Sequence, residues 1–539
     1  MVKFKYDSFF PFDSAREQQD QAIGFCLDEF VNSDKKFCII EAATGVGKSA
    51  IGLTIARYLN THEKSPEGFE KGAYFLTTQK ILQEQYVSDF PSVVSLQSAS
   101  NYSCKFKKNN SCAESQQILR AEEKSSKFFK ACTYSCVYKE RKQKFLDSSE
   151  SITNFPYFLT ETNYSGKIKP RQLLVIDEGH NIESVLSGFV EVSVSEYFAK
   201  NVLKIKFPTK MTQHQTFLWI RDTYLPQAAR RLKHYETSIE KFGGDKIRER
   251  LKEFKSLSMQ FDLIRSHVGK LKKFVKLYTG SNWVFETSAT DKRGFKKFTF
   301  KPIDISQYAE ECLFRMGDKV IIMSATIMNH DIFTRTLGIT GENSCFISLP
   351  SPFPRENRPV MISSVGSMSA KNIESTLPKL GRAVKEILSH HKNEKGIIHC
   401  KTYKIANYLK NYLRDSRILI HDHSNRDSVL RKHIGSKSPT VLLSPSMTEG
   451  VDLQGDASRF QVICKVPYPY LGDKLIRKRM NSIKGWYELQ TAKSVVQSVG
   501  RSIRSEDDHA VTYILDSDFQ RFLSRNKDLF SEDFLSCIV

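Results

Sequence analysis

The chain has 539 residues, too long for a single hydrophobic core, so its length predicts about three or four domains. It carries 81 lysines and arginines against 60 aspartates and glutamates, and this net charge of +21 indicates a polyanionic partner, nucleic acid before an acidic membrane surface. A generally basic host is the alternative explanation. No apolar stretch suits a secretory signal or a membrane span, so we expect a cytoplasmic protein whose clustered cysteines bind metal or act in catalysis.

The segment "KKFCIIEAATGVGKSAIGLTIARYL" predicts a buried strand, a glycine-containing loop and a helix. Within it, "AATGVGKS" satisfies the phosphate-loop pattern, in which a small residue and four further positions precede Gly-Lys-Ser. Glycines let backbone N–H groups converge on phosphate oxygens, while Lys48 can reach the β- and γ-phosphates and Ser49 can bind Mg²⁺. The residues predicted to bind nucleotide here are Ala43, Thr44, Gly45, Val46, Gly47, Lys48 and Ser49.

Residues 97–164 interrupt this strand–helix rhythm with a polar segment rich in lysine and serine. Four of the 11 cysteines fall within it, namely Cys104, Cys112, Cys132 and Cys136. Thiolates are soft ligands that both zinc and iron–sulfur clusters accept, although the short C-x₂-C pairs typical of structural zinc are absent. From the residues alone, iron–sulfur, zinc and unligated thiols all stay open.

The sequence "RQLLVIDEGH" at 171–180 returns to a buried strand. Asp177 follows that strand, at the edge of a parallel sheet where ligands bind. We predict that Asp177 holds Mg²⁺ through water and that Glu178 orients or deprotonates an attacking water. An ordinary acidic turn is the alternative, which the phosphate loop upstream makes weak.

Residues 191–300 change character again and favour a helical, basic insertion. Apolar residues spaced three or four apart predict one helix face, made of Leu251, Phe254, Leu257, Phe261, Ile264, Val268 and Leu271. The basic residues around them fit a solvated surface as well as they fit DNA contact.

A third α/β block begins with "DKVIIMSATI" near residue 318, and a Pro- and Ser-rich linker at 348–359 precedes a second series of strands and helices. That series contains "QSVGRSIR" at 497–504, where Arg501 and Arg504 share a helix face and can stabilise charge on a transferring γ-phosphoryl group. Alone, two such arginines are usually surface residues.

Taken in order, "AATGVGKS", "TTQKILQEQ", "IDEGH", "SAT", "SPF", "TEGVDLQGD" and "QSVGRSIR" resemble the motifs of XPD/DinG-type superfamily 2 helicases. The resemblance covers both α/β blocks. It implies an α/β fold of two RecA-like parallel-sheet lobes, the first lobe carrying a cysteine-bearing Fe–S insertion and a helical arch insertion. The implied divisions are lobe 1 in three parts (1–96, 165–190 and 301–347), the Fe–S insertion (97–164), the arch (191–300) and lobe 2 (348–539).

The resemblance also implies roles for residues outside the phosphate loop. Arg16 and Gln19 match the adenine-side motif, and Gly450, Asp452 and Gln497 match lobe 2 motifs that reach nucleotide. Residues Thr77, Gln79 and Gln83 match the segment that touches the tracking strand, and Ser324, Ala325 and Thr326 match the motif that couples hydrolysis to strand movement. One departure is Gly179, where this family usually has alanine.

The resemblance predicts an ATP- and Mg²⁺-dependent DNA helicase that moves 5′→3′ on single-stranded DNA and opens forked DNA, as a monomer without membrane contact. It places a [4Fe–4S] cluster on Cys104, Cys112, Cys132 and Cys136, which favours iron–sulfur over zinc. Two alternatives stay open: an ATP-driven translocase or clamp that remodels nucleoprotein complexes, and an RNA helicase.

Overall fold

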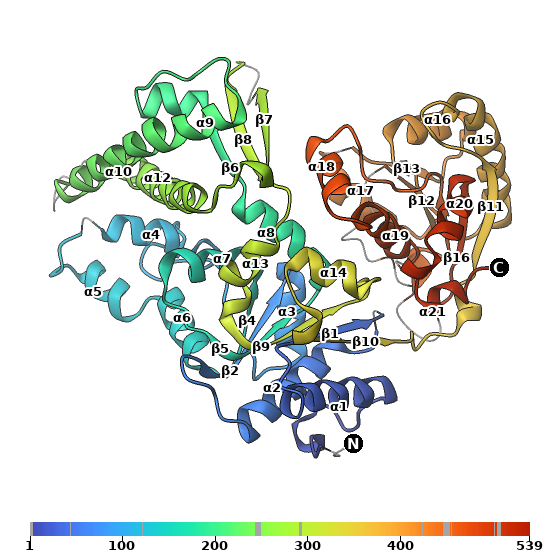
Figure 1. The fold of residues 1–539 in the computed structure, drawn as a ribbon, viewed down its shortest axis with the longest axis horizontal. Coiled ribbons are helices and arrows are strands. Elements are labelled where there is room, and N and C mark those ends of the chain that lie inside the picture. Colours follow the sequence, from blue (N-terminus) through green and yellow to red (C-terminus); the bar gives the residue numbers. More distant parts are fainter. Residues whose placement is uncertain are drawn as a thin grey trace.

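The computed structural model describes residues 4–43, 45–120, 122–242, 250–289, 294–422, 424–445, 453, 455–500, 502–503 and 508–539. Two parallel sheets lie well apart, each with helices around it (Figure 1). The first has the strand order β10-β1-β9-β5-β2-β4-β3. Its strands are β1 (Phe37–Ala42), β2 (Glu70–Thr77), β3 (Val94–Ser95), β4 (Glu150–Asn154), β5 (Arg171–Ile176), β9 (Gly317–Ser324) and β10 (Ser344–Leu349).

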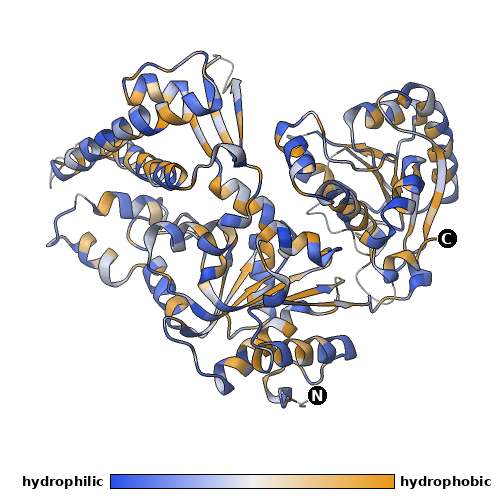
Figure 2. Ribbon diagram, in the orientation of Figure 1, coloured by the Kyte–Doolittle hydropathy of each residue, from blue (hydrophilic) through white to orange (hydrophobic). Residues whose placement is uncertain are grey.

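Strands β1 and β5 are buried at every position, as parallel strands covered on both faces must be. Because successive side chains point to opposite faces, Ile39 joins one apolar core and Ile40 the other. The second core receives helices α1 (Glu17–Val31), α2 (Lys48–His62) and α3 (Lys80–Asp89). Figure 2 shows the apolar strands enclosed by helices with polar outer surfaces.

The cysteine-bearing segment lies between β3 and β4 and forms α4 (Cys112–Leu119), α5 (Lys127–Tyr134) and α6 (Val137–Asp147). Strand β4 falls inside the expected 97–164 insertion but pairs in parallel with β2 in the main sheet. That boundary is therefore too long at its C-terminal end, because Ile152 of β4 is fully buried in the core of lobe 1. Helix α7 (Phe155–Thr160) follows and belongs to the same lobe.

The segment between β5 and β9 starts with α8 (Ile182–Val190) and continues into a separate subdomain (Figure 1). Its helices are α9 (Gln213–Trp219), α10 (Leu225–Glu240) and α12 (Leu251–Leu277). The expectation of a helical insertion is incomplete, because β6 (Val192–Ser195), β8 (Lys296–Pro302) and β7 (Trp283–Ala289) form an antiparallel sheet in that order. The predicted face of α12 is buried at Phe254, Phe261, Ile264, Val268 and Leu271.

Helices α13 (Ser306–Cys312) and α14 (His330–Leu337) complete lobe 1. The second sheet, in lobe 2, has the order β11-β16-β15-β12-β14-β13, and its neighbouring strands pair in parallel. Its strands are β11 (Val360–Gly366), β12 (Gly396–His399), β13 (Ile418–Ile420), β14 (Val441–Ser444), β15 (Phe460–Ile463) and β16 (Val511–Asp516).

Lobe 2 is covered by α15 (Ile373–His390), α16 (Tyr403–Leu413), α17 (Arg426–Gly435), α18 (Lys474–Ser482), α19 (Trp486–Val499), α20 (Asp518–Arg525) and α21 (Glu532–Leu535). Helices α18 and α19 lie on the side of lobe 2 that faces lobe 1 (Figure 1). Among the helices that the structure describes, none combines the length and apolarity that crossing a membrane requires.

Candidate nucleotide site between the lobes

The phosphate-loop sequence connects β1 to α2 at the carboxyl end of the sheet. Gly45 and Gly47 have φ values of +88° and +86°, a region that favours glycine. A Cβ on Gly47 would also lie 2.3 Å from Nε2 of Gln19, so a side chain there would displace the Gln19 amide. Lys48 is buried, and its Nζ donates to the carbonyl oxygens of Ala42 (3.0 Å) and Ala43 (3.2 Å). Thr44 lies outside the described residues.

Residues at the start of α1 form hydrogen bonds with this loop. Gln19 Nε2 donates to the carbonyl oxygen of Val46 at 2.9 Å, and the backbone N–H of Arg16 donates to Gln19 Oε1 at 2.9 Å. Arg16 Nη1 donates to the carbonyl oxygen of Gly45 at 2.8 Å. The two predicted adenine-side residues therefore contact the phosphate loop directly and set its position.

The acidic pair lies beside the loop, after β5. Burial raises the pKa of the Asp177 carboxyl, and the nearby Lys48 ammonium and the backbone N–H of Glu178 (2.9 Å) partly oppose that rise. A lysine and a carboxylate thus meet where two parallel strands end, an arrangement that suits a metal–phosphate complex.

Glu178 has a φ of +53°, unusual for a residue other than glycine and typical of strained functional turns. Its neighbour His180 shares a hydrogen bond with Ser324 Oγ through Nδ1 (2.8 Å) and lies 3.3 Å from Glu178 Oε2. The Ser324 hydroxyl in turn accepts the backbone N–H of Thr326 at 3.1 Å. The acidic turn is therefore hydrogen-bonded to the 324–326 motif.

This network continues into lobe 2. Gln497 Nε2, on α19, donates to Thr326 Oγ1 at 3.1 Å. The amide predicted to bind nucleotide thus contacts lobe 1 in this conformation. The other lobe 2 residues predicted for the site, Gly450, Asp452, Arg501 and Arg504, lie outside the described residues.

The predicted strand-tracking segment is only partly at the surface. Gln79 is exposed just before α3, but Thr77 and Gln83 are fully buried. Gln83 Nε2 donates to Ser95 Oγ (2.6 Å) and to the carbonyl oxygen of Leu96 (2.9 Å). Gln83 therefore positions the strand that precedes the cysteine segment, and in this conformation it is not a surface contact.

The four cysteines of the insertion are all buried and lie close enough to affect one another's pKa. Burial, together with the thiols of Cys136 and Cys104, raises the pKa of Cys132 to about 11. At Cys104 burial raises the pKa, but hydrogen bonds from Ser115 and from backbone N–H groups outweigh it and lower the pKa overall.

The chemistry of these donors suits a thiolate-bound metal or cluster. Their geometry in this conformation does not, since among the described residues no group of three or more His, Cys, Asp or Glu side chains is arranged to hold a metal ion. The expected [4Fe–4S] cluster is consequently not shown by the structure.

Comparison with known proteins supports the helicase resemblance. A family described as "Type III restriction enzyme, res subunit" matches residues 13–212, and one described as "Helicase C-terminal domain" matches residues 385–534. The structure is similar to a solved XPD helicase (TM-score 0.62, 15% identity, 96% of this chain and 99% of the other) and to Xpd4 of S. tokodaii (TM-score 0.57, 14% identity, 97% and 99%).

The chain is also similar to the ATP-dependent DNA helicase YoaA of Escherichia coli, with 21% identity over 432 residues, or 71% of this chain and 66% of YoaA. A probable ATP-dependent helicase of Methanocaldococcus jannaschii, MJ0942, is 21% identical over 633 residues, or 96% of this chain and 93% of the relative. The family models, the DNA helicase relatives and the XPD structures all support the resemblance to XPD/DinG-type superfamily 2 helicases.

The sheet topology and the similarity to XPD structures confirm the expected α/β fold with parallel-sheet RecA-like lobes. The two segments inserted in lobe 1 lie between β3 and β4 and between β5 and β9. The chain spans about two thirds of the length of the YoaA proteins that it matches, 66% in one and 68% in the other.

Proposed function

We propose that this helicase-family protein is an ATP- and Mg²⁺-dependent DNA helicase that translocates 5′→3′ on single-stranded DNA and opens forked duplexes. The observation that carries the proposal is the connection from the phosphate loop and acidic turn, through Ser324 and Thr326, to Gln497 of the other lobe. Such a connection lets the state of the nucleotide bias the position of one lobe against the other. The relatives YoaA and DinG, named as ATP-dependent DNA helicases, support DNA as the substrate.

In this proposal the residues of lobe 1 bind and cleave ATP. Lys48 contacts the β- and γ-phosphates once its bonds to backbone carbonyls are exchanged for phosphate oxygens. Ser49 and Asp177 hold Mg²⁺, and Glu178 orients the attacking water. The second lobe supplies Arg501 and Arg504 for the charge on the transferring phosphoryl group, and Gly450 and Asp452 for contacts to nucleotide and DNA.

We further propose that Cys104, Cys112, Cys132 and Cys136 hold a [4Fe–4S] cluster. Four buried thiols that influence one another's pKa supply a complete set of thiolate donors for such a cluster. A bound cluster would stabilise a module that is too small for a large apolar core of its own.

Strand-displacement assays test the function. Duplexes with a 5′ or a 3′ single-stranded overhang, made of DNA or of RNA, are incubated with ATP and Mg²⁺. We expect unwinding of the 5′-overhang DNA only, and no hydrolysis or unwinding with Lys48→Ala, which should still bind single strands.

Any other outcome of these assays would indicate a different function. DNA-stimulated hydrolysis with no strand displacement on any substrate would favour the translocase or clamp, and unwinding of RNA alone would favour an RNA helicase. Substantial hydrolysis by the Lys48→Ala variant would remove the phosphate-loop assignment.

A further inference from the structure

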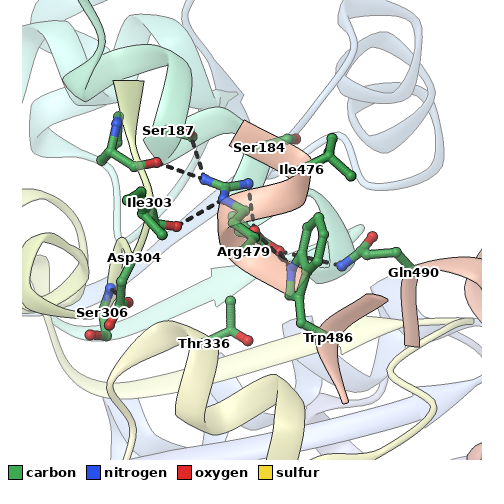
Figure 3. Close-up of polar contacts among 12 residues, drawn as sticks. Ser184, Ser187, Ile303, Asp304, Ser306, Thr336, Ile476, Arg479, Trp486 and Gln490 are labelled. Atoms are coloured by element: carbon green, nitrogen blue, oxygen red, sulfur yellow. Dashed lines mark hydrogen bonds and ion pairs between the residues drawn. The ribbon is translucent and has the colours of Figure 1, made fainter. Parts of the chain in front are cut away.

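A buried arginine of lobe 2 lies at the meeting point of three parts of the molecule. Arg479, on α18, is only 6% exposed although arginine is among the residues most often at the surface. Its guanidinium reaches lobe 1 and the base of the second insertion (Figure 3). Burial of an unpaired cation would be very unfavourable, so the guanidinium must be stabilised by the groups that surround it.

The carboxylate of Glu183, on α8 of lobe 1, is bound entirely by donors from lobe 2 among the contacts that the structure describes. Arg479 Nη1 lies 2.7 Å from Glu183 Oε1, and the indole Nε1 of Trp486 donates to both carboxylate oxygens at 3.0 and 2.9 Å. Gln490 Nε2 donates to Oε2 at 3.4 Å. Three side chains of lobe 2 therefore bind α8 at this one carboxylate.

The same guanidinium also binds the chain segments at both ends of the second insertion. Arg479 Nε donates to the carbonyl oxygen of Ile303 at 2.8 Å, and Nη2 donates to the carbonyl oxygen of Pro302 at 3.2 Å and to Ser187 Oγ at 3.1 Å. Pro302 ends β8 and Ser187 lies on α8. These are the two chain segments that enter and leave the second insertion, so one side chain ties both of them to lobe 2.

Helix α8 also connects this junction to the candidate nucleotide site. It begins directly after the turn that holds Asp177, Glu178 and His180, and it ends where β6 of the insertion starts. A shift of lobe 2 that moves Glu183 therefore moves α8. This helix is joined to the acidic turn at its N-terminus and to the second insertion at its C-terminus.

Apolar contacts between the two lobes flank this junction. Apolar residues Met328 and Ile332 of lobe 1 pack against the core of lobe 2. Gly485, just before α19, approaches so closely that a Cβ there would lie 2.7 Å from Ile332 Cδ1. Separating these surfaces would break the Arg479–Glu183 ion pair and its surrounding hydrogen bonds and would expose the apolar contact of Met328 and Ile332 to water. Contacts close to a rotation axis, by contrast, move little and can be kept.

We propose that the Arg479–Glu183 junction is the pivot about which lobe 2 turns, and that Arg479 is a positioning residue that makes the base of the second insertion follow lobe 2. The proposal rests on the helicase function above, because it assigns to this junction the coupling of ATP-driven lobe movement to the insertion. Arg479 touches neither nucleotide nor reacting atoms in this assignment.

The test compares Arg479→Gln, Arg479→Lys and a matched control, Arg477→Gln. Arg477 lies on the same helix but is exposed, and the hydrogen bonds that the structure describes for its guanidinium go to the carbonyl oxygen of Leu471 within lobe 2. DNA-stimulated ATP hydrolysis and strand displacement are measured on the same preparations, whose melting temperatures are recorded. The decisive quantity is the number of ATP molecules hydrolysed per base pair opened.

For Arg479→Gln we expect this ratio to rise by about tenfold, with the ATPase rate largely kept. Arg479→Lys should be intermediate, because it keeps the charge but loses the planar set of donors that reaches several acceptors at once. Arg477→Gln should match the wild type. An unchanged ratio in Arg479→Gln, or a parallel fall of both activities with a lowered melting temperature, would overturn the pivot.

A second measurement does not depend on activity. All 11 native cysteines are buried, so fluorophores can be placed on cysteines introduced at the exposed Ser281 in the insertion and Ser375 on α15. Without nucleotide, the energy-transfer distribution should be narrow in the wild type and in Arg477→Gln, and broad or shifted in Arg479→Gln. Identical distributions would refute the pivot even if unwinding is normal, whereas an inactive wild type with the expected distributions would refute the helicase function alone.

Discussion

Gly179 lies in the acidic turn, and the structure supplies a physical reason for glycine at this position. A Cβ built on Gly179 would lie 2.2 Å from Cγ2 of Ile322. Ile322 is fully buried in β9, paired with Ile39 of β1 and Ile176 of β5, so the strand cannot yield. The branched side chain of Ile322 occupies the space that an alanine at 179 would need.

We therefore expect Gly179→Ala to push the acidic turn outward. Ordinary contact begins near 3.4 Å, so the required displacement is about 1.2 Å, and overpacking of this kind costs about 1–3 kcal/mol of stability. A misplacement of about 1 Å at reacting groups can lower turnover by about 100-fold. Steady-state ATPase assays should show a loss mainly in kcat, because Glu178 and the hydrogen bond between His180 and Ser324 move with the turn.

Two second-site variants at Ile322 make the explanation refutable. Leucine has a similar volume but no branch at Cβ, so Ile322→Leu should restore most of the kcat and the melting temperature of Gly179→Ala. Ile322→Val keeps the clashing methyl and should not rescue. If Gly179→Ala alone is fully active, or if valine rescues as well as leucine, the steric account is wrong.

Three further predictions concern the same lobe. Burial raises the pKa of Asp177, so the folded protein binds this proton more tightly than the unfolded chain does, and this stabilisation is lost as pH rises through the raised pKa. The Asp177→Asn variant should therefore have a higher melting temperature than the wild type at neutral pH without nucleotide, and it should not turn over ATP. An unchanged or lower melting temperature would contradict this prediction. Gln19→Ala removes the hydrogen bond to Val46 and should raise KM for ATP by about tenfold with a smaller change in kcat, whereas equal losses in both would place Gln19 in the chemical step. Anaerobically purified protein should be brown with about four irons per chain, and Cys112→Ser should bleach it and stop unwinding while ATPase activity remains; colourless protein containing stoichiometric zinc would exclude the cluster.

The local geometry of the candidate nucleotide site could be predicted from the sequence because its parts lie close together in the chain. A continuous apolar run before "TGVGKS" predicts a central strand, and the glycines at 45 and 47 are required by backbone angles within the same few residues. The helical face of α12 was equally predictable, since its buried positions repeat with the period of one helix.

Other features depend on partners that lie far away in the chain, and only the tertiary structure decides them. Strand β4 is short and polar in its sequence, and it belongs to lobe 1 because β2 offers it a place in the sheet. Gln83 is buried because the segment before the cysteines folds over it. Glu183 and Arg479 carry no local signal at all, since a charged pair becomes informative only when folding brings two distant helices together and removes the water between them.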